Sequence, residues 1–221
     1  GAQMPINFFF HALAMAKHEA AIGIVLSGTG ADGSSGLRSI KENGGLCLAQ
    51  DPKTAAYDAM PVNAIGTGMV DFILPIPKMQ DILHRYAGSP YVIGKSDNDL
   101  GDLTTLPDHL TSILALLKTR LKRDFHYYKK STLIRRVRRR MGIVHVNDME
   151  GYLALLRKKP TELDNLFKDI LIGVTQFFRD PEAFEVLAKK VIPKIIKNRD
   201  ADEPIRVWVT GCSTGEEAYT V

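Results

Sequence analysis

The chain has 221 residues, of which 45% are hydrophobic and 24% are charged, and its formal net charge is +4 at pH 7. This composition is typical of a soluble globular protein and excludes intrinsic disorder and a collagen-like fold. The sequence contains no apolar run near the roughly 18 residues that cross a bilayer, and its N-terminus lacks the pattern of a secretory signal. We therefore expect a cytoplasmic protein without membrane insertion.

In chain order, residues 1–86 alternate between helix-forming and strand-forming segments. The pattern predicts a helix at 5–19, a strand at 21–26, a glycine-rich turn with a helix that stops at Gly44-Gly45, strands at 46–49 and 70–74, and turns at Asp51-Pro52 and Met60-Pro61. An order of strand, helix and strand indicates a parallel sheet covered by helices. The first 86 residues are thus expected to form a partial α/β layer.

The turn after the first strand reads SGTGADG over residues 27–33. Successive glycines let backbone N–H groups approach an anion, so the turn could cradle a phosphate. It lacks the lysine of a P-loop and the acid of a dinucleotide fingerprint. Asp32 is also well placed to cap the next helix by accepting N–H bonds from Ser34 or Ser35. The residues alone leave these alternatives open.

Residues 87–108 lose periodicity and collect Gly, Ser, Asp, Asn and Pro, so we interpret them as a linker. About five helices should follow between Leu110 and Asn198, with caps at Asn147, Thr161 and Asp180-Pro181. A strand at Ile205–Val209 and a glycine turn at 210–217 come last. The two cysteines, Cys47 and Cys212, lie in unrelated contexts and predict neither a disulfide framework nor a metal site.

Basic residues are concentrated in one stretch. Between Lys118 and Arg140 the chain carries eleven lysines and arginines against one acid, Asp124. Taken by itself, such a stretch could bind nucleic-acid phosphates, or it could be a solvated helix face. It contains little aromatic interleaving and no recognised nucleic-acid motif, so we do not expect nucleic acid to be the partner.

Residues 4–86 resemble a known family. The stretches AIGIVLSGTGADGSSGLRSIKENGG, AQDPKTAAYDAMPVNAI and TGMVDFILP are similar, in that order, to the C-terminal part of the CheB chemotaxis protein-glutamate methylesterases. In that family a Ser-His-Asp triad hydrolyses glutamate methyl esters on chemoreceptors. The resemblance implies that Asp32 is the triad acid, which orients the histidine and stabilises its charged form.

The other triad members are not matched in this sequence. The family's serine and histidine belong upstream of residue 1, and we interpret His11 and His18 as surface or packing residues. Thr29 stands where the family usually has methionine. A backbone N–H near the developing oxyanion survives that change. We therefore do not expect this segment to act as an esterase by itself.

Residues 109–221 resemble a second family. The stretches DFHYYKKSTLIRRVRRRMG, YLALLRKKPTELDNLFKDILIGVTQFFRDPEAFEVL and IRVWVTGCSTGEEAYTV are similar to the start of the CheR chemotaxis receptor methyltransferases. Those enzymes methylate receptor glutamates with S-adenosyl-L-methionine and release S-adenosyl-L-homocysteine. The family's later elements, including the acid for the cofactor ribose, would lie beyond Val221. Methyl transfer by this chain alone is therefore not expected.

The second resemblance also implies functional residues. Gly173 and Thr175 should lie near the methionine moiety of the cofactor, Arg179 near its carboxylate or the transfer centre, and Gly211 and Glu217 in the loop around it. The basic helix should face the acidic methylation helices of chemoreceptors through Arg135, Arg136, Arg138 and Arg139. Without the resemblance, Phe177 and Phe178 would be interpreted as core residues and Arg179 as a surface cation.

The sequence therefore predicts parts of two enzymes in one chain. We expect a methylesterase-like α/β segment at 1–86, a linker at 87–108, an all-α methyltransferase domain at 109–200, and the first strand of a Rossmann-like cofactor-binding sheet at 201–221. The expected function is adjustment of receptor methylation in both directions. The alternative is a non-catalytic module whose basic face binds receptor helices or nucleic acid.

Overall fold

The computed structural model describes residues 4–94, 106–173, 177–178, 181–197, 204–212 and 215–221. The chain divides into two compact units between Ile172 and Gly173. The first unit contains a sheet domain, residues 4–94, and a helical domain, residues 106–172. Within the described residues, no helix combines the length and the apolar character that a membrane span requires.

The sheet domain is built on three parallel strands in the order β1-β2-β3, with the bounds Ile22–Val25, Leu46–Gln50 and Phe72–Leu74. Their register pairs Ile22 with Leu46 and Leu48 with Phe72. All residues of β2 are buried, because this strand lies between its two neighbours and under helices on both faces. The parallel sheet predicted from the sequence is confirmed.

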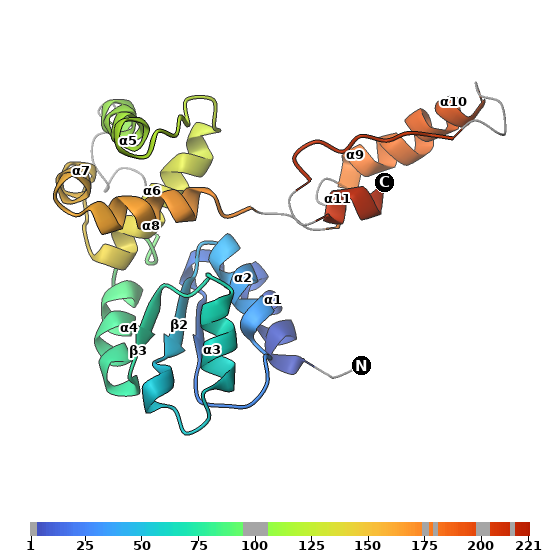
Figure 1. Ribbon diagram of the computed structural model, residues 1–221. Helices are drawn as coiled ribbons and strands as arrows, with labels where there is room; N and C mark the ends of the chain where they lie inside the picture. The colour runs from blue at the N-terminus through green and yellow to red at the C-terminus, as the bar shows by residue number, and fades with distance from the viewer. Residues whose placement is uncertain (1–3, 95–105, 174–176, 179–180, 198–203, 213–214) are drawn as a thin grey trace. The chain divides into compact units, whose positions relative to one another are not determined.

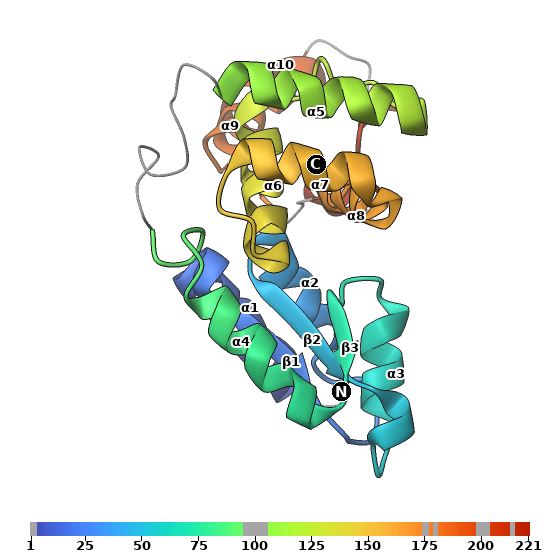
Figure 2. The ribbon, with the colours of Figure 1, turned by 90° about the vertical axis from the view of Figure 1, so that its left-hand side faces the viewer.

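Helices cover both faces of this sheet (Figures 1 and 2). They are α1 (Pro5–Lys17), α2 (Ser34–Glu42), α3 (Ala59–Gly66) and α4 (Met79–Ala87). Successive side chains of β2 point to opposite faces, so Cys47 and Ala49 join the core under α1, α2 and α3, while Leu46 and Leu48 join the core under α4. The sheet domain thus has two small cores that share one central strand.

Two helices of the sheet domain were missed by the sequence analysis. Met60-Pro61, interpreted as a turn, lies in the first turn of α3, where a proline removes no intrahelical hydrogen bond. The stretch predicted as a linker begins inside the fold, because α4 continues to Ala87 and the Tyr91 hydroxyl donates to Gly44 O at 3.1 Å. Residues 95–105 lie outside the described part.

The helical domain has a core of its own, made by α5 (Leu106–Leu121), α6 (Lys130–Val144), α7 (Met149–Lys158) and α8 (Pro160–Ile170). Two helix starts differ from prediction. Asp148, and not Asn147, caps α7 by accepting the Gly151 N–H at 2.7 Å. Helix α8 begins at Pro160, whose fixed φ suits the first helical position, so Thr161 is already inside the helix.

The second unit is smaller. A helical stretch runs from α9 (Pro181–Val186) through a π-helical turn (Leu187–Val191) into α10 (Ile192–Lys197), and α11 (Glu216–Thr220) lies near the end of the chain. The strand predicted at 205–209 is not formed, and Trp208 is 90% exposed. A strand needs a hydrogen-bonded neighbour, and the described residues supply none to this segment.

Candidate functional site

The glycine-rich turn after β1 is fixed by hydrogen bonds to the end of β2 and to the connection between β2 and β3. Ser27 N donates to Gln50 Oε1 and Gly28 N donates to Tyr57 O, each at 2.9 Å. The Asn63 side-chain amide donates to Gly30 O at 2.8 Å. These bonds hold the turn at the carboxyl end of the parallel strands, where open α/β sheets place their ligands.

Asp32 is the side chain that this turn holds most firmly. Its carboxylate accepts the backbone N–H groups of Ile6 at 3.1 Å, Asn7 at 3.0 Å and Gly33 at 2.9 Å. Ile6 and Asn7 lie in the first turn of α1, so Asp32 satisfies the start of that helix. The bonds from Ser34 or Ser35 that the sequence predicts are not formed: the N-cap of α2 is Gly33, and Ser34 N donates to Ala31 O.

The histidines in this region have other roles. The His11 ring lies 3.2 Å from Ser39 Oγ on an exposed part of α1, and His18 follows the end of the same helix. This agrees with the interpretation of both as surface or packing residues. The Asp32 carboxylate is thus held in place by three backbone N–H groups, and neither histidine is its partner.

The predicted cofactor residues are only partly described. Thr175 and Arg179 lie outside the described residues, and Gly173 is exposed at the start of the second unit. Phe177 and Phe178 are more than half exposed, so neither is a core residue, although the Phe178 ring packs edge-on against Phe184.

The second glycine turn, at 210–217, lies within the described residues except for positions 213 and 214. Gly211 and Gly215 have φ values of 68° and 109°, which favour glycine, and α11 begins directly after Gly215. Glu217 is exposed in the first turn of α11. A Cβ added at Gly211 would meet nothing within 4 Å, so the backbone there is open to close approach. An open glycine turn followed by an exposed carboxylate suits the cofactor role that the sequence suggested.

The basic helix α6 does not present all its arginines to solvent. Arg136 and Arg139 are 1% and 0% exposed, and Arg140 is buried as well. Arg135 is exposed and Arg138 is half-buried. The prediction that Arg136 and Arg139 belong to an exposed partner-binding face is therefore corrected, because their guanidinium groups already bind acceptors inside the first unit.

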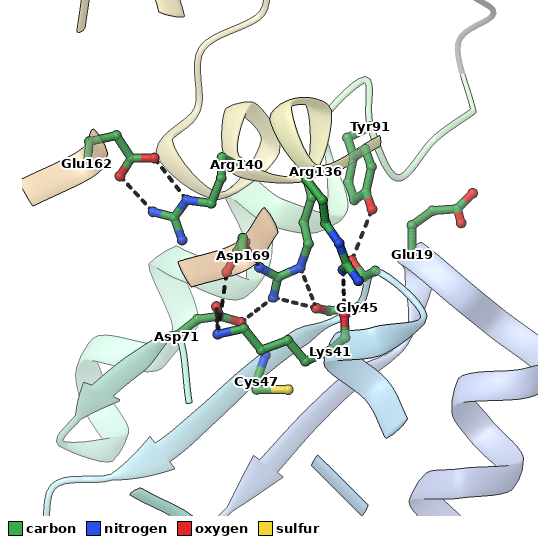
Figure 3. Close-up of polar contacts among 12 residues, drawn as sticks. Glu19, Lys41, Gly45, Cys47, Asp71, Tyr91, Arg136, Arg140, Glu162 and Asp169 are labelled. Carbon is green, nitrogen blue, oxygen red and sulfur yellow. Dashed lines mark hydrogen bonds and ion pairs between the residues drawn. The ribbon is translucent and has the colours of Figure 1, made fainter. Parts of the chain in front are cut away.

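A buried four-charge cluster is made by Lys41, Asp71, Arg139 and Asp169, and Arg139 pairs with both of its carboxylates. Figure 3 labels Lys41, Asp71 and Asp169 of this cluster. Arg139 Nη2 lies 2.6 Å from Asp71 Oδ2, and Arg139 Nη1 donates to Asp169 Oδ2. Lys41 Nζ lies 3.1 Å from Asp71 Oδ1 and 3.6 Å from Asp169 Oδ1. The cluster pairs two cations with two carboxylates, so it carries no net charge.

Burial and pairing act in opposite directions on these groups. Burial would raise the pKa of Asp71, but Arg139 and Lys41 hold that pKa below its ordinary value. Burial would lower the pKa of Arg139, but Asp71 and Asp169 hold it well above its ordinary value. Arg136, whose bonded acceptor is a carbonyl, has its pKa lowered to about 10 by burial and by the Arg135 and Arg139 cations.

A second buried ion pair lies wholly inside the helical domain. Arg140 donates from Nε and Nη2 to the two oxygens of Glu162, at 2.9 and 2.6 Å, and the Tyr152 hydroxyl donates to the same carboxylate at 3.0 Å. Burial would lower the pKa of Arg140, but the bonds to Glu162 raise it. This forked geometry ties α6 to α8.

Comparison with protein families matches the chain in three consecutive parts. Residues 1–83 match the CheB methylesterase, residues 108–171 match the all-alpha domain of the CheR methyltransferase, and residues 173–221 match the SAM binding domain of the CheR methyltransferase. The chain is a CheB segment followed by CheR domains. The CheB segment lies within the sheet domain, the CheR all-alpha domain corresponds to the helical domain, and the second unit is the start of the CheR SAM-binding domain.

Two individual relatives match this chain over different lengths. A 104.1 kDa protein of Rhodobacter capsulatus, named as uncharacterized, is 38% identical over 237 aligned residues, which cover 99% of this chain and 25% of that protein. A putative protein-glutamate methylesterase/protein-glutamine glutaminase of Leptospira interrogans is 39% identical over 80 residues, covering 36% of this chain and 42% of that protein. This chain thus spans about a quarter of the Rhodobacter relative and under half of the Leptospira one.

One solved structure matches part of this chain. The catalytic domain of Thermotoga maritima CheB methylesterase is 31% identical to this chain, with a TM-score of 0.34, and the match covers 35% of this chain and 41% of that one.

Sequence reasoning missed three members of the four-charge cluster, namely Lys41, Asp71 and Asp169. The sequence did contain one signal. In the CheR basic helix, Leu133, Val137 and Met141 recur every four residues and mark a buried stripe. Arg136 and Arg140 flank that stripe, so their burial could have been inferred from spacing. Nothing in the sequence pointed to a carboxylate partner in the CheB segment.

Proposed function

We propose that this chain is part of a protein that adjusts the methylation of chemoreceptor glutamates in both directions. The observation that carries the proposal is the presence of both enzyme families in one chain, in an order that the Rhodobacter capsulatus relative matches over 99% of this chain. The CheR part would add methyl groups, and the CheB part would remove them. The activity, substrates and partners of the whole protein all belong to this proposal.

The cofactor proposed for the transferase is S-adenosyl-L-methionine. When bound, this cofactor would supply a methyl group that its own sulfonium makes reactive. The protein then mainly has to align donor and acceptor. Gly173, Thr175 and Arg179 would hold its methionine end, while the open turn at Gly211 would let the backbone approach the cofactor. The exposed carboxylate of Glu217 would supply the acidic contact.

The decisive experiment is calorimetric titration of S-adenosyl-L-homocysteine, the expected product, into this chain and into its Arg179→Ala variant. We expect binding that the substitution abolishes. Arg206→Ala is the matched control, because Arg206 is an exposed cation of the same unit and should leave binding unchanged. Binding that survives in Arg179→Ala would contradict the assignment of that residue. A chain that binds nothing would show that residues up to Val221 do not complete the pocket.

The support for Asp32 as the acid of an esterase triad is the way its carboxylate is bonded. A carboxylate offers about four acceptor positions. The Ile6, Asn7 and Gly33 amides use three of them, two on Oδ1 and one on Oδ2. A position on Oδ2 is thus left for the N–H of an imidazole. In a longer protein with the whole esterase, Asp32→Asn should lower ester hydrolysis by roughly 10⁴-fold, and an unchanged rate would refute this role.

The surface proposed to contact receptors includes fewer arginines than the sequence suggested. Of the four arginines assigned to it, Arg135 is exposed and Arg138 is half-buried. Lys129 and Lys130 are exposed at the start of α6 and extend the same basic surface. Acidic receptor helices would meet this end of α6, since Arg136 and Arg139 are already bound to acceptors in the first unit.

A further inference from the structure

Contacts between the helical domain and the sheet domain converge on the end of α2. Arg139 donates to Gly45 O from Nε at 3.2 Å and from Nη2 at 2.8 Å, and Arg136 donates to Lys41 O at 3.2 Å (Figure 3). A helix leaves its last carbonyls without intrahelical partners, and these carry a partial negative charge. Two arginines of the helical domain therefore donate hydrogen bonds to backbone carbonyls at the end of α2 and in the turn after it.

The four-charge cluster joins the same two domains. Lys41 and Asp71 come from the sheet domain, and Arg139 and Asp169 come from the helical domain. Each domain supplies one cation and one carboxylate, and the Arg139–Asp71 and Lys41–Asp169 pairs cross between them. The side chains are 8% exposed or less, so a charge that lost its partner would have little water to replace it.

Apolar contacts complete this surface. Ile143 of α6 belongs to the same core as Leu46, Leu48 and Tyr86 of the sheet domain. Gly142 allows the close approach, because a Cβ at this position would lie 3.1 Å from Tyr91 Cβ. Helix α6 is therefore buried on two sides, by the core of its own domain and by the sheet domain.

We propose that α6 is the docking surface by which the CheR all-alpha domain holds the CheB segment, and that Arg139, shared between Asp71 and Asp169, is the residue on which this docking depends. The partner is fixed by its chemistry: the Asp71 carboxylate lies beside the Lys41 and Gly45 carbonyls at the end of α2 and in the turn after it. Docking makes the two domains one body that does not rely on the connecting residues. It also withdraws Arg136 and Arg139 from any other acidic partner.

The test uses the full chain with a protease site introduced within residues 95–105. After cleavage the two pieces should elute together in gel filtration at physiological salt. Asp71→Asn keeps an acceptor for the Cys47 N–H, which Asp71 Oδ2 now binds at 3.0 Å, but removes the charge that pairs with Arg139. This variant should weaken association of the cleaved pieces by about 100-fold or more, as measured by their separation on dilution.

Arg140→Gln is the matched control, because it breaks an equally buried ion pair, one residue further along α6, that does not reach the sheet domain. It should lower the melting temperature while the cleaved pieces still elute together. Gly142→Leu tests the same surface without changing a charge. Leucine favours the helix more than glycine does, yet its side chain should force the pieces apart by displacing Tyr91.

Three results would overturn the proposal. The first is separation of the unsubstituted pieces after cleavage at physiological salt, while each retains its circular dichroism spectrum. The second is equal association in Asp71→Asn, Gly142→Leu and the unsubstituted chain. The third is release of the pieces by Arg140→Gln as readily as by Asp71→Asn, because general destabilisation rather than docking would then account for the effect.

Discussion

At the scale of single residues, the first unit contains buried arginines that bind acceptors in its interior. Arg139 has five N–H donors in a rigid fork, which lets one side chain bind two carboxylates and a carbonyl at once. A lysine at this position would offer a point charge and could not reproduce the forked geometry. Position in the helix, and not charge alone, decides which arginines of the basic stretch remain available to a partner.

The lowered pKa of Asp71 makes a prediction about acid stability. Its folded-state pKa lies below the unfolded value of about 3.9. The stability that its charge contributes is therefore fully present above that value and is lost as pH falls through the folded-state pKa. Asp71→Asn should be less stable than the unsubstituted chain at pH 7, and the difference should shrink towards pH 2.

Urea unfolding midpoints between pH 7 and pH 2 measure this effect. Asp81→Asn serves as the control, because Asp81 is an exposed carboxylate of α4 in the same domain. A difference between Asp71→Asn and the unsubstituted chain that stays constant over the whole range would contradict the prediction.

At the scale of elements, local pattern predicted most of what was found, and the failures have physical reasons. The three strands and the helix that ends before Gly44-Gly45 were predicted because apolar runs and glycines mark them directly. Helix α3 was missed because a proline in a first helical turn has the same appearance as a proline in a turn. The role of Asp32 stays a prediction made through resemblance, and its bonds to α1 come from residues about 25 positions away, which spacing does not reveal.

The glycine turn after β1 allows a matched comparison of backbone effects. A Cβ added at Gly30 or at Gly66 meets nothing within 4 Å, but Gly30 has a φ of 89° whereas Gly66 ends the helix α3. Gly30→Ala should lower stability by about 1–2 kcal/mol, because a Cβ disfavours the left-handed region. Gly66→Ala should raise it by roughly 0.4–1 kcal/mol. Thermal unfolding of both variants tests this, and equal shifts of the same sign would refute the backbone explanation.

At the scale of the whole molecule, the chain consists of two compact units with different degrees of burial. The first unit holds the buried cores and both buried ion-pair sites, while every described residue of α9 and α10 is exposed or only half-buried. Family matches place the whole SAM-binding portion of this chain in the second unit. The stability of this chain should therefore come mainly from the first unit.

The single tryptophan of the chain gives a direct check on this difference. Trp208 lies in the second unit and is 90% exposed. Its fluorescence should already be that of indole in water, so its emission maximum should change little across the unfolding transition that circular dichroism detects in the helices. Acrylamide quenching should be equally strong before and after unfolding. A native emission at short wavelength that shifts to the red would show that Trp208 is buried.

The sharing of Arg139 between Asp71 and Asp169 has a consequence for how such chains can be recombined. A CheR domain that carries another residue in place of Arg139 would not supply this cation. Grafted onto this CheB segment, it would leave Asp71 facing the new neighbour without its cation, a situation that costs several kcal/mol. A functional chimera of two fused proteins should therefore take its CheB segment and its CheR all-alpha domain from the same parent. A substitution at position 71 should be tolerated when position 139 changes with it.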